Sequence, residues 1–160
     1  MAKDQLATYL NDHLAGSVVA IELMEHLEAA HAHSPIGRAV GEVRGEVIAD
    51  RQALESLMTH LQIPESRTRK ATAWVTEKLT ELKLRVDDPA AGALRLLEAL
   101  EAISLGIEGK RSLWLALSAA SEGTPALATL DYERLIRRAE EQRSIIEVMR
   151  IGAARAALCL

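Results

Sequence analysis

Phenylalanine is absent from this sequence of 160 residues, and aromatic residues make up only 2% of it. β-Sandwiches and barrels depend on aromatic and β-branched side chains, so this composition argues against them. Hydrophobic residues nevertheless reach 49%, which leaves mainly Leu, Ile, Val, Ala and Met to build a core. Such a core is typical of helix-on-helix packing, and the chain is long enough to bury one as a single domain over residues 1–160.

The sequence also has little cysteine, no excess of positive charge and no long uninterrupted apolar run. Because Cys159 is the only cysteine, we expect no disulfide framework and a reducing, cytoplasmic location. Met1–Leu10 contains Asp4 and lacks the apolar run of a secretory signal. The net charge is −4 and the densest basic cluster, Arg67–Lys70, is short, which argues against a nucleic-acid partner. Charged residues interrupt the most apolar stretch, Ala90–Ala120, so no membrane span is predicted.

Hydrophobic periodicity and helix-start signals predict five helical segments. Ser34-Pro35 and Asp88-Pro89 each combine an N-cap residue with a proline at the first helical position, and Asp131 is a further N-cap. Apolar residues recur every three or four positions after these signals. The predicted helices run approximately over Asp4–Ala30, Pro35–Gln62, Pro64–Leu84, Pro89–Ala120 and Asp131–Leu158.

The lengths of the connections predict how these helices are arranged. Short loops join the first helix to the second and the fourth to the fifth, so each pair should form an antiparallel hairpin. More than twenty residues, including the shorter third helix, separate the two hairpins. We therefore expect an all-α, antiparallel four-helix bundle with an additional short crossover helix.

This order of two hairpins and a long crossover resembles the ferritin-like superfamily. The resemblance covers nearly the whole chain, at the level of helix order and length. It implies a bundle whose core helices can bind two metal ions through a Glu on each of two helices and Glu-x-x-His on each of the other two. This sequence has one Glu-x-x-His, Glu28-Ala-Ala-His31, at the end of the first helix.

Several polar residues fall inside the apolar arcs of the predicted helices, where a bundle core should be hydrophobic. His13, Ser17 and Asp50 should lie at similar heights if the first two helices form a hairpin with a short loop. The complete set is His13 and Ser17 on the first helix, Asp50 on the second, Glu101 and Glu108 on the fourth, and Gln142 with Arg138 at its edge on the fifth.

Three interpretations of this set remain open. The favoured one is a buried hydrogen-bond network, because buried carboxylates need partners. In it His13 pairs with Asp50, and Glu101 and Glu108 pair with Arg138, Lys110 or Gln142. In the second, His13, Asp50, Glu101 and Glu108 bind a single Mn, Fe or Zn ion. In the third, one or more of these faces points to solvent or to an interface, and the residues never converge.

These interpretations lead to three hypotheses for function. The favoured one is a non-catalytic structural or interaction module with a buried polar network and no cofactor. The alternative is a metal-binding protein or metal-dependent oxidoreductase of ferritin-like type. A third is a small-molecule binder, for which we expect a mid-bundle pocket lined by Glu101, Glu108 and Gln142; the sequence does not identify the ligand.

Three glycines at four-residue spacing, Gly37, Gly41 and Gly45, lie within the second predicted helix. Each glycine in a helix interior costs about 1 kcal/mol relative to alanine. Small residues at this spacing allow close approach of another helix. We expect that partner to be the crossover helix or the same helix of a second subunit, which predicts a homodimer. The alternative is that this end of the helix is frayed.

Overall fold

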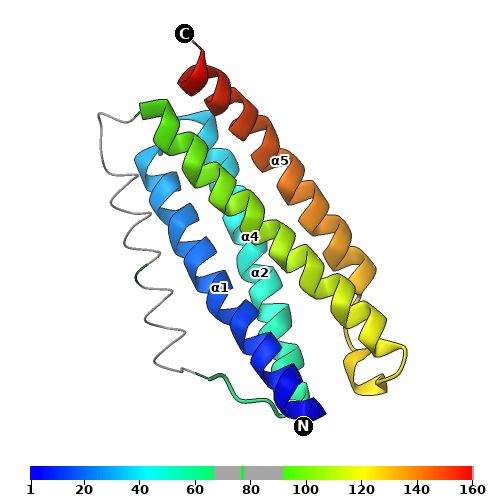
Figure 1. The fold of residues 1–160 in the computed structure, drawn as a ribbon. Helices are drawn as coiled ribbons and strands as arrows, with labels where there is room; N and C mark the ends of the chain where they lie inside the picture. The colour runs from blue at the N-terminus through cyan, green and yellow to red at the C-terminus, as the bar shows by residue number, and fades with distance from the viewer. Residues whose placement is uncertain (67–76, 78–91, 160) are drawn as a thin grey trace.

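In a computed structural model, the chain forms an all-α bundle, and the residues described are 1–66, 77 and 92–159 (Figure 1). Within these ranges the predicted fold class is confirmed, and no β-strand occurs. The elements are α1 (Ala2–Ala30), α2 (Pro35–His60), α4 (Gly92–Ser121), a short 3-10 helix η2 (Pro125–Leu127) and α5 (Tyr132–Leu158).

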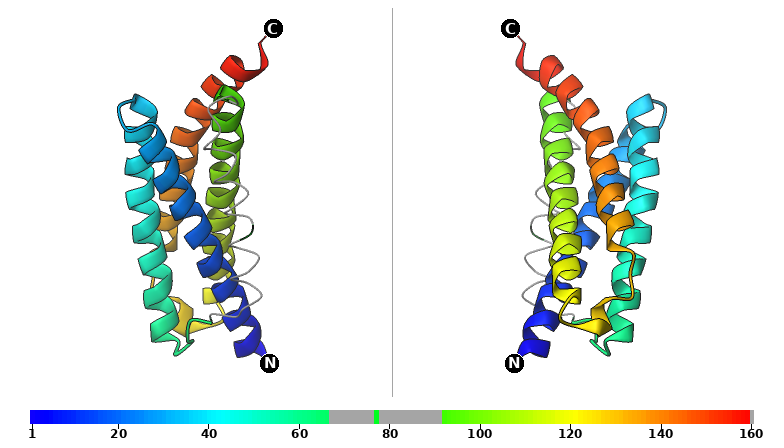
Figure 2. Two further views of the ribbon diagram at one scale, coloured as in Figure 1. Left: turned by 90° about the vertical axis from the view of Figure 1, so that its left-hand side faces the viewer. Right: turned by 90° about the vertical axis from the view of Figure 1, so that its right-hand side faces the viewer.

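The helices form two antiparallel hairpins, α1–α2 and α4–α5, that lie side by side (Figure 2). Between the hairpins, α1 packs against α4 and α2 against α5. In Figure 1, α2 and α4 run down the page whereas α1 and α5 run up it, so every packed pair is antiparallel. This arrangement requires the long connection between α2 and α4, as the sequence predicts.

The predicted crossover helix lies almost entirely outside the described residues. Its expected first residues, Pro64–Ser66, are described and are not helical. α2 ends just before them because Gln62 adopts a left-handed conformation with φ 54°, and the amide of Ile63 donates a hydrogen bond back to the carbonyl of Met58. This is a common helix-terminating arrangement, and Pro64 then disfavours helical geometry at the residue before it.

Two predicted helix starts are confirmed by side-chain caps. The hydroxyl of Ser34 accepts a hydrogen bond from the amide of Gly37, and Pro35 occupies the first helical position of α2. The carboxylate of Asp131 accepts from the amide of Arg134 at the start of α5. These caps satisfy amide groups that have no partner within the helix. The predicted start at Asp88-Pro89 lies outside the described residues.

The core is built from aliphatic side chains of all four helices, as the composition indicates. The exceptions are Trp114 and Tyr132, which are 1% and 6% exposed and have ring centroids 6.5 Å apart. Across residues 1–66 and 92–159, no helix qualifies as a membrane span by length, hydropathy and charge together.

The buried face of α4 differs from the one expected. The sequence pattern places Leu94, Leu97, Leu105 and Leu115 on the same side of the helix as Glu101 and Glu108; of these only Leu97 is buried, and the other three are exposed. Apolar residues surround α4 on most sides, so periodicity alone does not determine which side is buried. The buried face is instead formed by Leu97, Leu100, Ile103, Ser104, Ile107, Trp114 and Leu117.

The glycine stripe of α2 allows a close approach, but its described neighbour is α1 and the α1–α2 turn. A Cβ atom at Gly37 would lie 2.1 Å from the carbonyl oxygen of His31. A Cβ atom at Gly41 would lie 2.6 Å from the carboxylate of Glu28. Gly45 has open space around it. Gly37 is therefore explained by a backbone contact within the hairpin, whereas at Gly41 only the end of the Glu28 side chain would have to move.

Candidate functional site

The most buried charged residue described is Asp50 of α2, which is only 1% exposed. Lys110 of α4 donates a hydrogen bond from Nζ to Asp50 Oδ2 at 2.5 Å. Arg138 of α5 donates from Nη2 to Asp50 Oδ1, and Gln142 donates from Nε2 to Asp50 Oδ2 at 3.1 Å. One carboxylate thus connects α2 to both helices of the second hairpin.

Gln142 extends this arrangement into a network. Its carboxamide oxygen accepts a hydrogen bond from Lys110, and its Nε2 also donates to Oε2 of Glu46 at 3.0 Å. Gln142 is fully buried, so both ends of its amide need partners, and both have them. Two carboxylates and two cations, Asp50 and Glu46 with Lys110 and Arg138, give the network no net charge.

The pKa of Lys110 is changed more by burial than by the charges around it. Desolvation lowers the pKa of the Lys110 ammonium below its usual value of 10.5, and the attraction of Asp50 opposes this effect only in part. A buried cation is costly without a counter-charge, and Asp50 provides that charge directly.

A pocket of about 410 Å³ lies between α1, α2 and α4, beside this network. Asp50 and Lys110 line it, so the network forms part of its wall. The remaining lining is mostly apolar and is contributed by Tyr9, Asp12, His13, Gly16, Ser17, Ala20, Met24, Val47, Arg51, Leu54, Gly106, Ile107, Gly109, Leu113 and Trp114.

His13 and Ser17 line the same pocket as Asp50, in agreement with the similar heights expected from the sequence. The His13 ring makes an edge contact with Tyr9, with centroids 4.7 Å apart, and no hydrogen bond to Asp50 occurs in the described structure. Burial lowers the pKa of His13, an effect that nearby Asp12 partly opposes. The Ser17 hydroxyl donates to the carbonyl of Leu14 at 2.6 Å. His13 and Asp50 therefore do not form the expected pair; they line the same pocket instead.

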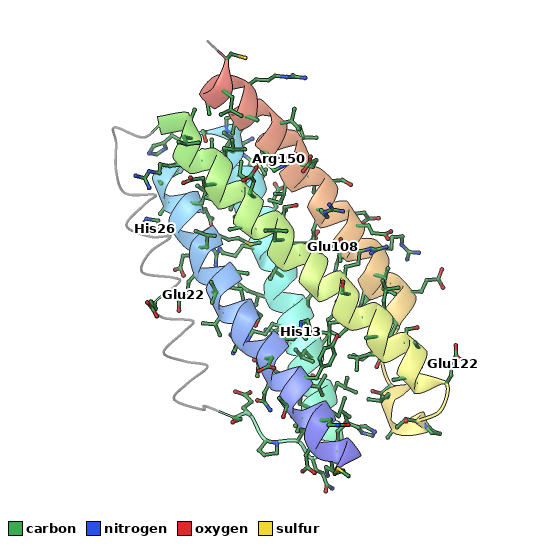
Figure 3. The ribbon with its side chains drawn as sticks, viewed as in Figure 1. His13, Glu22, His26, Glu108, Glu122 and Arg150 are labelled. Atoms are coloured by element: carbon green, nitrogen blue, oxygen red, sulfur yellow. The ribbon has the colours of Figure 1, made fainter. Side chains whose placement is uncertain are left out.

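Glu101 and Glu108 lie elsewhere, along the outer junction of α4 and α5. Arg150 pairs with Glu101 at 3.3 Å. Arg111 and Arg143 pair with Glu108 at 3.2 and 3.4 Å. Figure 3 shows Glu108 and Arg150 along the α4–α5 hairpin, away from the α1 side of the molecule. Neither glutamate lines the pocket, because the buried face of α4 is the opposite one.

The candidate metal ligands are consequently not brought together. Asp50 is bound by two cations and an amide, whereas Glu101 and Glu108 are bound by arginines on the outer junction. Among the residues that the structure describes, no group of three or more His, Cys, Asp or Glu side chains could hold a metal ion. The buried network around Asp50 and Gln142 is the interpretation that the geometry supports.

Lys110 was expected to pair with Glu101 or Glu108, whereas it donates to Asp50 and Gln142. Glu46, which accepts from Gln142, was not identified from the sequence. Lys110 lies three residues after Ile107 and four before Trp114, so it falls on the buried stripe of α4. Gly16 and Gly109 are helix-interior glycines, yet a Cβ atom at either would meet nothing within 4 Å. Gly45 shares this property and lies outside the pocket, so helix-interior glycines alone do not identify the site.

Comparison of the sequence with known protein families and curated proteins, and of the fold with solved structures, gives no match. The helix order agrees with the bundle and long connection expected from the ferritin-like resemblance, and no family is assigned.

Proposed function

We propose that this chain is a non-catalytic helical bundle that binds a small, largely apolar organic molecule between α1, α2 and α4. The observation that carries this proposal is the pocket of about 410 Å³, which falls in the usual range of small-molecule sites. Its mostly apolar wall interrupted by a few polar groups is also typical of such sites.

Three glycines lie in the wall of the pocket and widen it. Gly16, Gly106 and Gly109 all line it. A Cβ atom at Gly106 would only touch Ala20 at 3.8 Å, and at the other two it would meet open space. The absence of side chains at these three positions contributes to the open space of the pocket.

The hydrogen bonding favours binding over chemistry. Asp50 accepts three hydrogen bonds, and the Ser17 hydroxyl donates to a backbone carbonyl. Neither is paired with His13 in the manner of an activated nucleophile or a general base. The polar groups of the wall therefore hold the bundle together and orient a bound molecule.

The proposal can be tested with α-methylstyrene, a small apolar probe, by thermal unfolding and by ¹⁵N-NMR titration. At about ten times its Kd, a ligand that binds only the native state adds about 1.4 kcal/mol of stability. For a chain of this size the melting temperature should then rise by about 3–6 °C.

Two glycine variants locate the site. Gly16→Leu adds a side chain in the open space of the pocket lining and should abolish the thermal shift. Gly45→Leu is the matched control because Gly45 is also a helical glycine with open space, on α2 and outside the pocket. It should bind like the wild type. Absence of binding to the wild-type protein, or equal binding to both variants, would contradict the proposal.

A second candidate is the interaction module expected from the sequence, in the form of a homodimer. It is favoured by Leu105 and Val148, which are 74% and 76% exposed on α4 and α5. Glutamates and arginines alternate on this hairpin. In a two-fold symmetric dimer, the glutamates of one subunit could therefore face the arginines of the other. Light scattering should give twice the monomer mass for the wild type and the monomer mass for Leu105→Glu; a monomeric wild type would exclude it.

A further inference from the structure

The acidic and basic side chains that line the pocket do not balance one another completely. Asp50 pairs with Lys110 at 2.5 Å, and both belong to the network that has no net charge. Arg51 pairs through its Nε with Glu55 at 2.7 Å. Asp12 of α1 also lines the pocket, and it forms no ion pair within the part of the chain that the structure describes. The charge of Asp12 is therefore balanced by no described lysine or arginine.

His13 does not supply the missing positive charge at neutral pH. Burial lowers the pKa of its imidazole below 6.5, and the attraction of the neighbouring Asp12 opposes this effect only in part. The ring is therefore mainly neutral at about pH 7, and one of its nitrogens is then an acceptor. The wall of the pocket consequently carries one surplus negative charge.

Asp12 lies at the edge of the pocket, where solvent reaches it. Tyr9, Asp12, His13 and Gly16 follow one another at spacings of three or four residues on α1, so they share one side of this helix. Asp12 and Gly16 are exposed, and a Cβ atom at Gly16 would meet nothing within 4 Å. Apolar lining residues such as Ile107, which is 2% exposed, lie deeper. The pocket thus has an acidic edge and an apolar interior.

The acceptors at this edge agree with the surplus charge. The carboxylate of Asp12 can only accept hydrogen bonds, and Tyr9 and His13, which form none in the described structure, can accept as well as donate. Lys110 and Arg51 retain donors, but their charges are already offset. Hydrogen-bond capacity alone therefore admits a neutral ligand, and the charge decides. Asp12 attracts a cation and repels an anion, which would leave water without a counter-charge.

We propose that the ligand of this pocket is a small apolar amine that binds as its ammonium ion. Its hydrocarbon part occupies the apolar interior, and its ammonium group pairs with Asp12 at the exposed edge. This inference rests on the proposed small-molecule-binding function and adds the chemical class of the ligand.

Three probes that share a phenyl ring separate the alternatives in ¹⁵N-NMR titrations of the full chain at neutral pH. α-Methylbenzylamine is a cation, α-methylstyrene is an uncharged molecule of nearly the same shape, and benzoate is an anion. The wild type should bind the amine more tightly than benzoate. Salt screens exposed charges, so adding about 0.5 M NaCl should weaken binding of the amine but not binding of α-methylstyrene.

The decisive variant is Asp12→Asn, which removes the charge and keeps the shape of the side chain. Asp12 is exposed and without an ion pair, so the variant should fold like the wild type. It should weaken amine binding about threefold to fivefold, the effect of an ion pair at an exposed site, and change α-methylstyrene binding by less than about twofold. The matched control is Glu25→Gln, because Glu25 is also an exposed carboxylate on α1 but lies outside the pocket. It should bind the amine like the wild type.

The outcomes distinguish the two proposals. If none of the three probes binds, the proposed function fails and this inference fails with it. If α-methylstyrene binds but Asp12→Asn binds the amine as tightly as the wild type, the pocket is a ligand site and the proposed ligand class is wrong. Tighter binding of benzoate than of the amine would also overturn the cation. Amine binding that persists in Gly16→Leu would lie outside the pocket and would contradict the inference.

Discussion

Replacing Asp50 with asparagine should destabilise this protein more than any comparable change at a surface carboxylate. The substitution Asp50→Asn keeps the shape of the side chain but removes the counter-charge of Lys110 and Arg138, and the new NH₂ group would face their donors. Breaking a buried ion pair costs about 3–5 kcal/mol. The Lys110 and Arg138 side chains are 14% and 22% exposed, so partial hydration reduces the expected loss to about 2–4 kcal/mol.

Urea unfolding followed by circular dichroism measures this loss, and thermal unfolding should show a fall of about 4–16 °C in the melting temperature. Glu108→Gln is the matched control because Glu108 also pairs with two cations, Arg111 and Arg143, on the outer junction. Solvent screens such pairs, so the control should lose less than about 1 kcal/mol.

Equal losses in Asp50→Asn and Glu108→Gln would refute the role given to burial. A further variant examines the mechanism: Asp50→Leu combined with Lys110→Met and Arg138→Met removes the charges together. Replacing a buried ionic group by apolar side chains is often neutral or stabilising by about 1–4 kcal/mol. The triple variant should therefore be more stable than Asp50→Asn. If it is less stable, Asp50 does not stabilise the protein by pairing with the charges of Lys110 and Arg138.

Local geometry gives three further predictions. Burial lowers the pKa of His13 below 6.5, so the unfolded chain takes up a proton before the folded one as the pH falls. The free energy of unfolding should therefore decrease below pH 6.5. In urea titrations, His13→Gln should lose less of this free energy than the wild type between about pH 7 and about pH 5. Gly37→Ala should destabilise because its Cβ would meet the His31 carbonyl at 2.1 Å, whereas Gly45→Ala should stabilise by up to about 1 kcal/mol; opposite signs in thermal unfolding check this. Asp131→Ala removes the α5 cap and should cost about 1 kcal/mol by chemical denaturation; no loss would contradict the cap.

The sequence predicted those parts of the fold that depend on local signals. Ser34 and Asp131 are caps whose chemistry is complete within four residues, so the starts of α2 and α5 could be predicted. Asp50 and Gln142 each interrupt a narrow apolar stripe, which made them identifiable as buried polar residues.

The remaining parts of the site depend on how the helices are placed relative to one another. α4 is apolar on most sides, so Glu101 and Glu108 were assigned to its inner face, although Lys110 lies there. The partner of Asp50 was therefore misassigned to His13. The pocket itself requires three helices to be positioned, so no local pattern in the sequence predicts it.

The network around Asp50 also has a consequence for arrangements that the bundle does not adopt. One such arrangement would shift the two hairpins past each other by one helical turn. Such a slide would separate Asp50 on α2 from Lys110 on α4 and Arg138 on α5, leaving buried charges against hydrocarbon. The free-energy cost of unpaired buried charge would arise only in the shifted registers, because the observed register pairs these charges. The network therefore selects one register for the two hairpins, whatever it contributes to the stability of that register.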